Sequence, residues 1–197
     1  APVVSFRVPN SGVTVAGGTG FDALSVVTLP TGYAKKLTLL GNGGDDTLTS
    51  NVLAGTSLDG GEGNDSIVGG AGKETMYGGN GNDTLLGNGG DDKPTAGAGA
   101  DVPPGGLGND AITGDVNDTL IESGDVNFTM TSSVLAGLGI DRLSGLGAVR
   151  LTGGDLKNII RVSGFSGRVT LIGGGGDDSL SGGTSGATSL DGGDGND

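Results

Sequence analysis

Apolar residues in this chain occur singly at a short regular interval, not in runs or helical stripes. Ile67, Met76 and Leu85 lie nine residues apart, each flanked by small or polar residues. One inward side chain within about three residues is typical of a very short, half-buried strand. The pattern therefore predicts short strands separated by turns of about six residues.

The turns repeat with the same interval. In nines from Gly60 the chain gives GGEGNDSIV, GGAGKETMY, GGNGNDTLL, GNGGDDKPT, AGAGADVPP and GGLGNDAIT. Further copies are GNGGDDTLT at 41–49, GGGGDDSLS at 173–181 and GGDGND at 192–197. The sixth position is acidic throughout. A fixed period of this kind indicates a repeat architecture.

The composition of the turns favours a hard cation. Glycine at the first, second and fourth positions allows positive φ, so that carbonyl oxygens can gather around one point. Ca²⁺ accepts six to eight carbonyl and carboxylate oxygens in a flexible shell, whereas Mg²⁺ demands near-octahedral geometry.

This nonamer resembles the haemolysin-type, or RTX, calcium-binding nonapeptide G-G-x-G-x-D-x-U-x, in which U is apolar. The resemblance implies an all-β fold, a right-handed parallel β-roll or β-helix solenoid with two nonamers in each coil of about 18–20 residues. It also implies that each Ca²⁺ lies between turns of successive coils on one edge, bound by sixth-position aspartates and turn carbonyls.

The predicted calcium ligands follow from the motif, and roughly six ions are expected. The side chains are Asp46, Asp65, Asp83, Asp92, Asp101, Asp110, Asp178 and Asp197, with Glu74 weaker because its extra methylene distorts a turn fitted to aspartate. The backbone ligands are Gly41, Gly43, Gly60, Glu62, Gly78, Asn80, Gly87, Gly89, Gly105, Leu107, Gly173 and Gly175. The alternative for each aspartate is a solvated turn carboxylate. The fifth-position residues Asp45, Asp91 and Asp177 are expected to face water.

The spacing assigns each carboxylate to an edge of the roll. One edge is predicted to hold Asp46, Asp65, Asp83 and Asp101, and the other Glu74, Asp92 and Asp110. Metal occupancy is therefore predicted to be richer on the first of these edges. The register is expected to end after Asp110 and to restart on a new block with Asp178 and Asp197.

Four segments are predicted. Residues 1–40 and 120–172 are expected to be solenoid coils without clean calcium turns, 41–119 the calcium-binding roll, and 173–197 the start of a second, truncated calcium block. The strands predicted outside the nonamers are Val4–Val8, Ala23–Leu29, Asn127–Thr131, Val149–Thr152, Ile159–Val162 and Val169–Ile172. The sequence of 37–65 recurs at 169–197, offset by 132 residues. This recurrence indicates about one and a half copies of a larger unit.

Three prolines interrupt the strand positions of the repeat. Pro94, Pro103 and Pro104 stand where other nonamers carry strand residues such as Leu85 and Ile112. Proline cannot donate to a sheet ladder. A weak coil or hinge, tolerated drift and wrongly assigned residues are the three interpretations, and the metal turns are predicted to survive.

Composition narrows the classes of function. The chain has 46 glycines and 3% aromatic residues, so a large apolar core is not expected. Its formal charge of −13 disfavours nucleic-acid partners. It lacks cysteine and histidine, which excludes disulfides, thiolate sites and histidine-dependent catalysis. No apolar run approaches the length of a membrane span, so no membrane insertion is expected.

These observations predict a calcium-folded structural or adhesive module of a large secreted or cell-surface protein, such as a surface layer, fibre or adhesin. The alternative is the calcium-dependent roll of a secreted enzyme or toxin whose catalytic domain lies outside this chain. No carboxylate departs from the metal pattern, so the chain itself is not expected to be an enzyme. The resemblance implies type I secretion from a Gram-negative bacterium. Calcium is the expected partner, and exposed strands at the ends of the solenoid predict end-to-end or lateral self-association.

Overall fold

The computed structural model describes residues 12–29, 33, 36–53, 55–108, 110–114, 118–123, 129–130, 134–136, 140–144, 146–163, 165–183, 186 and 188–197. Within these residues the regular structure is all strand. The strands are β1 (Val13–Ala16), β2 (Ala23–Val26), β3 (Leu37–Gly43), β4 (Thr47–Ser50), β5 (Thr56–Glu62), β6 (Ser66–Val68), β7 (Thr75–Asn80), β8 (Thr84–Leu86), β9 (Lys93–Ala98), β10 (Ala111–Thr113), β11 (Thr119–Ser123), β12 (Thr129–Met130), β13 (Val134–Ala136), β14 (Ile140–Ser144), β15 (Ala148–Thr152), β16 (Ile159–Ser163), β17 (Arg168–Gly175), β18 (Ser179–Gly183) and β19 (Thr188–Asp194). No helix long and apolar enough to cross a membrane occurs in this part of the chain.

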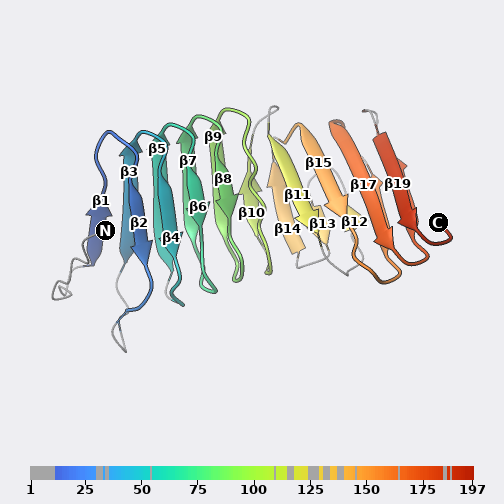
Figure 1. Ribbon diagram of the computed structural model, residues 1–197, viewed down its shortest axis with the longest axis horizontal. Helices are drawn as coiled ribbons and strands as arrows, with labels where there is room; N and C mark the ends of the chain where they lie inside the picture. The colour runs from blue at the N-terminus through green and yellow to red at the C-terminus, as the bar shows by residue number, and fades with distance from the viewer. Residues whose placement is uncertain are drawn as a thin grey trace.

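The strands form two stacked faces along which the chain winds (Figure 1). One face is a single sheet in the order β1-β3-β5-β7-β9-β10-β14-β13-β12-β16-β18, here called the long sheet. The other face consists of two four-stranded sheets, β2-β4-β6-β8 and β11-β15-β17-β19. From β1 to β9 and from β14 to β19, consecutive strands alternate between the faces and pair in parallel with the strand one coil away, which confirms the predicted parallel β-roll.

The core between the faces is a thin layer of inward side chains, one apolar residue from the shortest strands and two from longer ones such as β3 and β15. On the long sheet Leu39, Leu58 and Met76 are register partners, and on the opposite sheet Leu48 and Ile67 continue into Leu85. These residues are fully buried and form one cluster. A second cluster fills the C-terminal coils, with Ile112, Leu120, Val149, Leu151, Ile160, Val162, Val169 and Leu171 among its members. Each nonamer thus contributes its one apolar strand residue, as the sequence period predicts.

The predicted strands outside the nonamers are largely present. β2, β12, β15, β16 and β17 fall on five of the six predicted segments, and the sixth, Val4–Val8, lies outside the described residues. The coil after β11 differs from the prediction, because it carries three strands on the long sheet. β13 pairs antiparallel with both β12 and β14, while β14 pairs in parallel with β10.

The 132-residue duplication is also present in the structure, with a change of face. β3, β4 and β5 correspond to β17, β18 and β19. β3 and β5 belong to the long sheet, whereas β17 and β19 belong to the opposite four-stranded sheet. The two copies are therefore offset by a half-integer number of coils.

The three prolines weaken both faces at the same level. Pro94 lies in β9 opposite Met76, and β9 keeps its pairing with β7 but pairs with β10 at one position. Around Pro103 and Pro104 the described residues of the opposite face form no strand, and they retain a bridge between Thr84 and Val102 and a hydrogen bond from Gly87 N–H to the Pro104 carbonyl at 3.3 Å. Because proline has no N–H to donate, this face divides there into its two four-stranded sheets.

Replacing Pro103 and Pro104 with the residues of a regular nonamer should stabilise the roll. The double variant Pro103→Ile, Pro104→Thr restores two backbone donors, worth about 1 kcal/mol each in net hydrogen bonding. Urea unfolding in saturating calcium should therefore show a gain of about 1–2 kcal/mol. Pro94→Leu is the matched control, with a smaller gain expected because β9 is already paired with β7. A larger gain from Pro94→Leu would contradict this account.

Candidate calcium sites in the turns

The turns between the faces stack into two edges. The first edge comprises the turns that leave the long sheet, and the second edge the turns that return to it. Their sixth-position residues are Asp22, Asp46, Asp65, Asp83, Asp101 and Asp118 on the first edge, and Glu74, Asp92, Asp110, Asn158, Asp178 and Asp197 on the second. The division of Asp46, Asp65, Asp83 and Asp101 from Glu74, Asp92 and Asp110 is the one that the spacing predicts.

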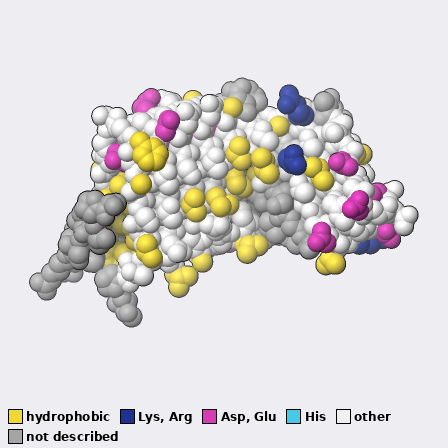
Figure 2. All heavy atoms as spheres, viewed as in Figure 1, with side chains coloured by type: hydrophobic (Ala, Val, Ile, Leu, Met, Phe, Trp, Pro, Cys, Tyr) yellow, Lys and Arg dark blue, Asp and Glu magenta, His cyan; other side chains and the backbone are white. Residues whose placement is uncertain are grey.

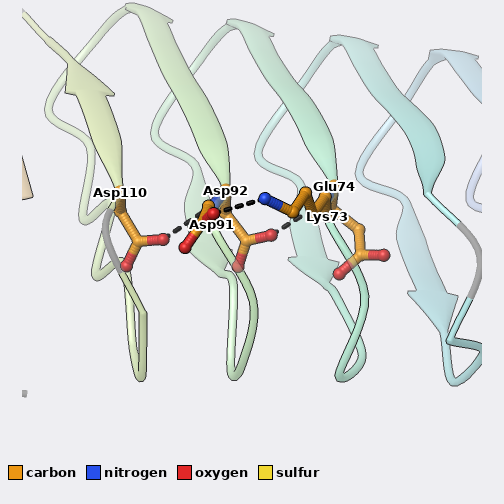
Figure 3. A network of polar contacts seen from close by, with 5 residues as sticks. All are labelled: Lys73, Glu74, Asp91, Asp92 and Asp110. Carbon is orange, nitrogen blue, oxygen red and sulfur yellow. Dashed lines mark hydrogen bonds and ion pairs between the residues drawn. The ribbon is translucent and has the colours of Figure 1, made fainter. Parts of the chain in front are cut away.

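Sixth-position side chains are joined into ladders by hydrogen bonds between coils. The backbone N–H of Asp46 donates to Oδ1 of Asp65 at 2.8 Å, and that of Asp65 donates to Oδ1 of Asp83 at 2.8 Å. On the second edge Glu74 N–H donates to Asp92 and Asp92 N–H to Asp110, each at 2.7 Å (Figure 3). The same contact recurs from Asp22 to Asp46, Asp83 to Asp101, Asp101 to Asp118, Asn158 to Asp178 and Asp178 to Asp197. One carboxylate oxygen of each rung thus sets the stacking of the turns.

The second carboxylate oxygen is buried without a partner in several rungs. Within the described part of the chain, no hydrogen bond reaches Oδ2 of Asp46, Asp65, Asp83, Asp92 or Asp178. These side chains are at most 5% exposed, and the acidic side chains visible in Figure 2 lie toward the two ends of the molecule. An unsatisfied buried carboxylate oxygen is costly, so its position indicates a cation partner.

Glycine at the first position of each turn leaves the space that such a cation needs. A Cβ on Gly60 would collide with Oδ2 of Asp65 and with the carbonyl oxygen of Gly78 in the next coil. Gly41, Gly78, Gly87 and Gly173 show the same convergence of their own turn's carboxylate and the next coil's carbonyl. In the part of the chain that the structure describes, no three carboxylates gather into a metal site. Backbone oxygens must therefore complete a calcium shell, and the turns supply them.

The predicted backbone ligands fall into two groups. First-position carbonyls, such as those of Gly60 and Gly78, point toward the buried carboxylate oxygens. Third-position carbonyls accept hydrogen bonds from the preceding turn, as Glu62 does from Gly44 N–H at 2.8 Å and Asn80 from Gly63 N–H at 2.8 Å. A third-position carbonyl keeps a second lone pair, so a metal role there would be additional to this bond.

Fifth-position residues form a second, outer ladder that the sequence did not predict. Asp45 is exposed, yet its Oδ1 accepts the N–H of Asn64 at 2.7 Å, and Asn64 Oδ1 accepts that of Asn82 at 2.8 Å. Asp177 accepts the N–H of Asn196 at 3.0 Å. These bonds run in the opposite direction to the sixth-position ladder, so each gap between turns is held from both sides.

Sequence reasoning missed three rungs: Asp22, Asp118 and Asn158. GGTGFDALS at 17–25 keeps the motif, and GGDLKNIIR at 153–161 keeps it in part, with leucine for the fourth-position glycine and asparagine for aspartate. Asp118 lies 17 residues after Asp101 and belongs to the first edge, so that ladder extends beyond the expected end of the register. The motif itself was the available signal at 17–25 and 153–161.

Burial is the main influence on the ladder carboxyls. Together with a smaller contribution from neighbouring carboxylates, it raises the pKa of Asp83 to about 6 and that of Asp92 to about 7. The pKa values of Asp65, Glu74 and Asp110 are raised for the same leading reason. Backbone hydrogen bonds lower each pKa but do not offset burial. Without a cation, the ionised form is therefore disfavoured in the fold.

The fold and its stacked acidic turns define a β-roll of the calcium-binding repeat class. The model of the RTX calcium-binding nonapeptide repeat matches in four copies, over residues 38–52, 55–85, 68–103 and 161–184, and the chain belongs to this family. RTX repeats bind calcium, and the buried aspartates agree with that property. Neither the curated proteins nor the solved structures contain a match to the chain.

The metal-free roll should be more stable in mild acid than at neutral pH. An unfolded aspartate titrates near 3.9, below the folded pKa values of Asp83 and Asp92, so protonation favours the fold. In EGTA this stability should be complete below about pH 4 and lost as the pH rises to about 7. Circular dichroism and hydrodynamic radius in EGTA at about pH 5 and pH 8 test this.

Asp92→Asn should reduce the pH dependence of the metal-free roll, because it removes one titrating ladder carboxyl. The variant thereby separates the effect of the ladder carboxyls from the general effect of net charge. In saturating calcium the roll should instead be more stable at neutral pH than in mild acid, because protons compete with the metal for the carboxylates. A metal-free chain that is more compact at pH 8 than at pH 5 would contradict the prediction.

The space above the first-position glycine should be essential to the site. In Gly60→Ala the new methyl group would displace the Asp65 carboxylate and the Gly78 carbonyl. Overpacking of this kind costs about 1–3 kcal/mol, equivalent to a calcium midpoint raised about fivefold or more. Gly20→Ala is the matched control, because nothing lies within 4 Å of a Cβ there. Equal midpoints for the two variants in a calcium titration would refute the assignment.

Proposed function

We propose that calcium ions bind between successive turns and fold this chain as a structural or adhesive module of a larger secreted or cell-surface protein. The observation that carries the proposal is the row of buried carboxylate oxygens without partners, at Asp46, Asp65, Asp83, Asp92 and Asp178. The ligands would be these carboxylates and the facing first-position carbonyls. Asp101, Asp110 and Asp197 occupy equivalent rungs and complete the predicted aspartates, with Glu74 as the weaker predicted ligand.

Folding and metal binding would form one equilibrium. Successive ladder carboxylates are desolvated and close to one another, so the metal-free roll is penalised at neutral pH. Calcium supplies the positive charge that these oxygens lack, and binding free energy then becomes folding free energy. Extracellular calcium sites commonly work at about 10⁻⁴–10⁻³ M, so the chain would remain expanded in a calcium-poor cytosol and fold after export.

The distribution of buried charge supports a binding role over a catalytic one. All buried acidic side chains among the described residues belong to the ladders, and none lies apart from them as a separate acid or base. The matched family is a calcium-binding repeat. The duplicated unit β3–β5 and β17–β19 supports a repetitive structural protein. Type I secretion from a Gram-negative bacterium remains an extension of the family resemblance.

Occupancy would be unequal between the edges. The first edge carries an unbroken ladder of aspartates from Asp22 to Asp118. Ladders on the second edge are shorter and contain Glu74 and Asn158. Self-association would use the terminal strands of the sheets, β1 and β18 on the long sheet and β19 on the opposite face.

A calcium titration followed by circular dichroism tests the proposal. The wild-type chain should gain β structure with calcium, lose it with EGTA and respond weakly to magnesium. Asp65→Asn should raise the calcium midpoint about tenfold, because it removes the charge of one ligand at two neighbouring gaps. Asp59→Asn, the same change on the outer face of β5, should leave the midpoint within about twofold. A spectrum unchanged by calcium would refute calcium-dependent folding.

A further inference from the structure

Each carboxylate ladder begins with a turn whose sixth side chain bonds within its own turn. Asp22 Oδ2 accepts Gly18 N–H at 2.5 Å, Glu74 Oε2 accepts Gly70 N–H at 3.0 Å, and Asn158 Oδ1 accepts Gly154 N–H at 2.9 Å. In later rungs such as Asp65, the corresponding Oδ2 lacks a hydrogen-bond partner among the described residues. In a starting turn, the side-chain oxygen that faces its own turn is therefore engaged, while Oε1 of Glu74 is buried and receives no hydrogen bond among the described residues.

The two starting turns of the second edge share a further departure from the repeat. Their fifth residues are Lys73 and Lys157, next to Glu74 and Asn158. The fifth residues of the other described turns are Phe21, Asp45, Asn64, Asn82, Asp91, Ala100, Asp177 and Asn196. Lysine at this position thus coincides with the replacement of the sixth-position aspartate.

Lys73 spans the gap that follows its turn. Its ammonium group forms an ion pair with Oδ2 of Asp91 in the next coil. Figure 3 shows the Lys73 side chain extending from the turn of Glu74 toward the turn of Asp91 and Asp92. Side-chain exposures of 70% for Lys73 and 44% for Asp91 place the pair at the solvent side of the gap. A cation fixed there repels a second cation and compensates the carboxylates that would otherwise attract it.

The same juxtaposition recurs in the second ladder. Asn158 N–H donates to Oδ1 of Asp178 at 2.7 Å, which brings the two turns into register. Lys157 and Asp177 directly precede these residues and occupy the same relative positions as Lys73 and Asp91. Asn158 also removes one negative charge from the gap. This gap therefore has one more lysine and one fewer carboxylate than a gap between two aspartate turns.

We propose that lysine replaces calcium in two gaps, between turns 69–74 and 87–92 and between turns 153–158 and 173–178. Calcium on the second edge then binds only in the gaps that follow. The inference rests on the proposed function, since it divides the gaps of the same ladders into two kinds. Lys73 and Lys157 are specificity-determining residues, and their turns are metal-free caps that define where each second-edge calcium row starts.

Counting bound ions by native mass spectrometry in saturating calcium tests the inference. Lys73→Asn with Glu74→Asp recreates the sequence GGAGND and should bind one calcium ion more than the wild-type chain. Lys157→Asn with Asn158→Asp should also gain one ion. Lys36→Asn is the matched control: it removes one positive charge from an exposed residue outside the turns and should leave the count unchanged.

A single substitution provides a second readout that does not depend on the folding of the double variants. Glu74→Gln keeps the side-chain length and the acceptor for Gly70 N–H, so the calcium count should equal that of the wild-type chain. Loss of one ion in Glu74→Gln, or no gain in either double variant that folds, would overturn the inference. Absence of calcium from the wild-type chain would instead refute the proposed function, so the two failures are distinguishable.

Discussion

One hydrogen bond, repeated between coils along each ladder, determines both the stacking of this roll and its chemistry. The N–H of a sixth-position residue such as Asp65 donates to Oδ1 of the residue one coil further on, here Asp83. This contact requires that the carboxylate be buried between two turns. It satisfies one oxygen and leaves the other facing glycine-lined space. The fold therefore creates an unmet demand for positive charge wherever it stacks two aspartate turns.

The core is too thin to meet that demand by apolar burial alone. Each strand contributes only one or two inward apolar residues, and Leu58, Ile67 and Met76 are the single ones of successive half-coils. Burying a side chain of this size stabilises a fold by about 1.5–3 kcal/mol, whereas ordering each backbone residue costs about 1–2 kcal/mol. With 46 glycines in the chain, the ordering term is large. Contacts in the turns must therefore supply the remainder, and raised carboxyl pKa values show that without metal those contacts oppose folding at neutral pH.

The period of nine predicted the strands and edges wherever it was unbroken, as at Asp65 and Glu74. It failed where the spacing changed: Asp22 lies 24 residues before its partner Asp46, and Asn158 lies 20 before Asp178. Asp118 was not predicted because its distance from Asp110 does not match the period of nine, and it belongs to the other edge. The antiparallel strands β12–β14 depend on long-range pairing, for which the nonamer carries no signal. Fifth-position hydrogen bonds depend on side-chain direction, which spacing alone does not give.

The half-coil offset between the two copies of the long unit follows from the near equivalence of the two faces. A nonamer fits either edge, because each edge joins the same kind of short strand to its neighbour. The turn ending at Asp46 lies on the first edge, whereas its copy ending at Asp178 lies on the second. In the turn between β16 and β17, on the first edge, Phe165 is buried in the apolar cluster of the C-terminal coils. A roll stabilised at only one edge could open at the other. Apolar packing at Phe165 therefore closes the first edge of these coils, and carboxylate stacking at Asp178 closes the second.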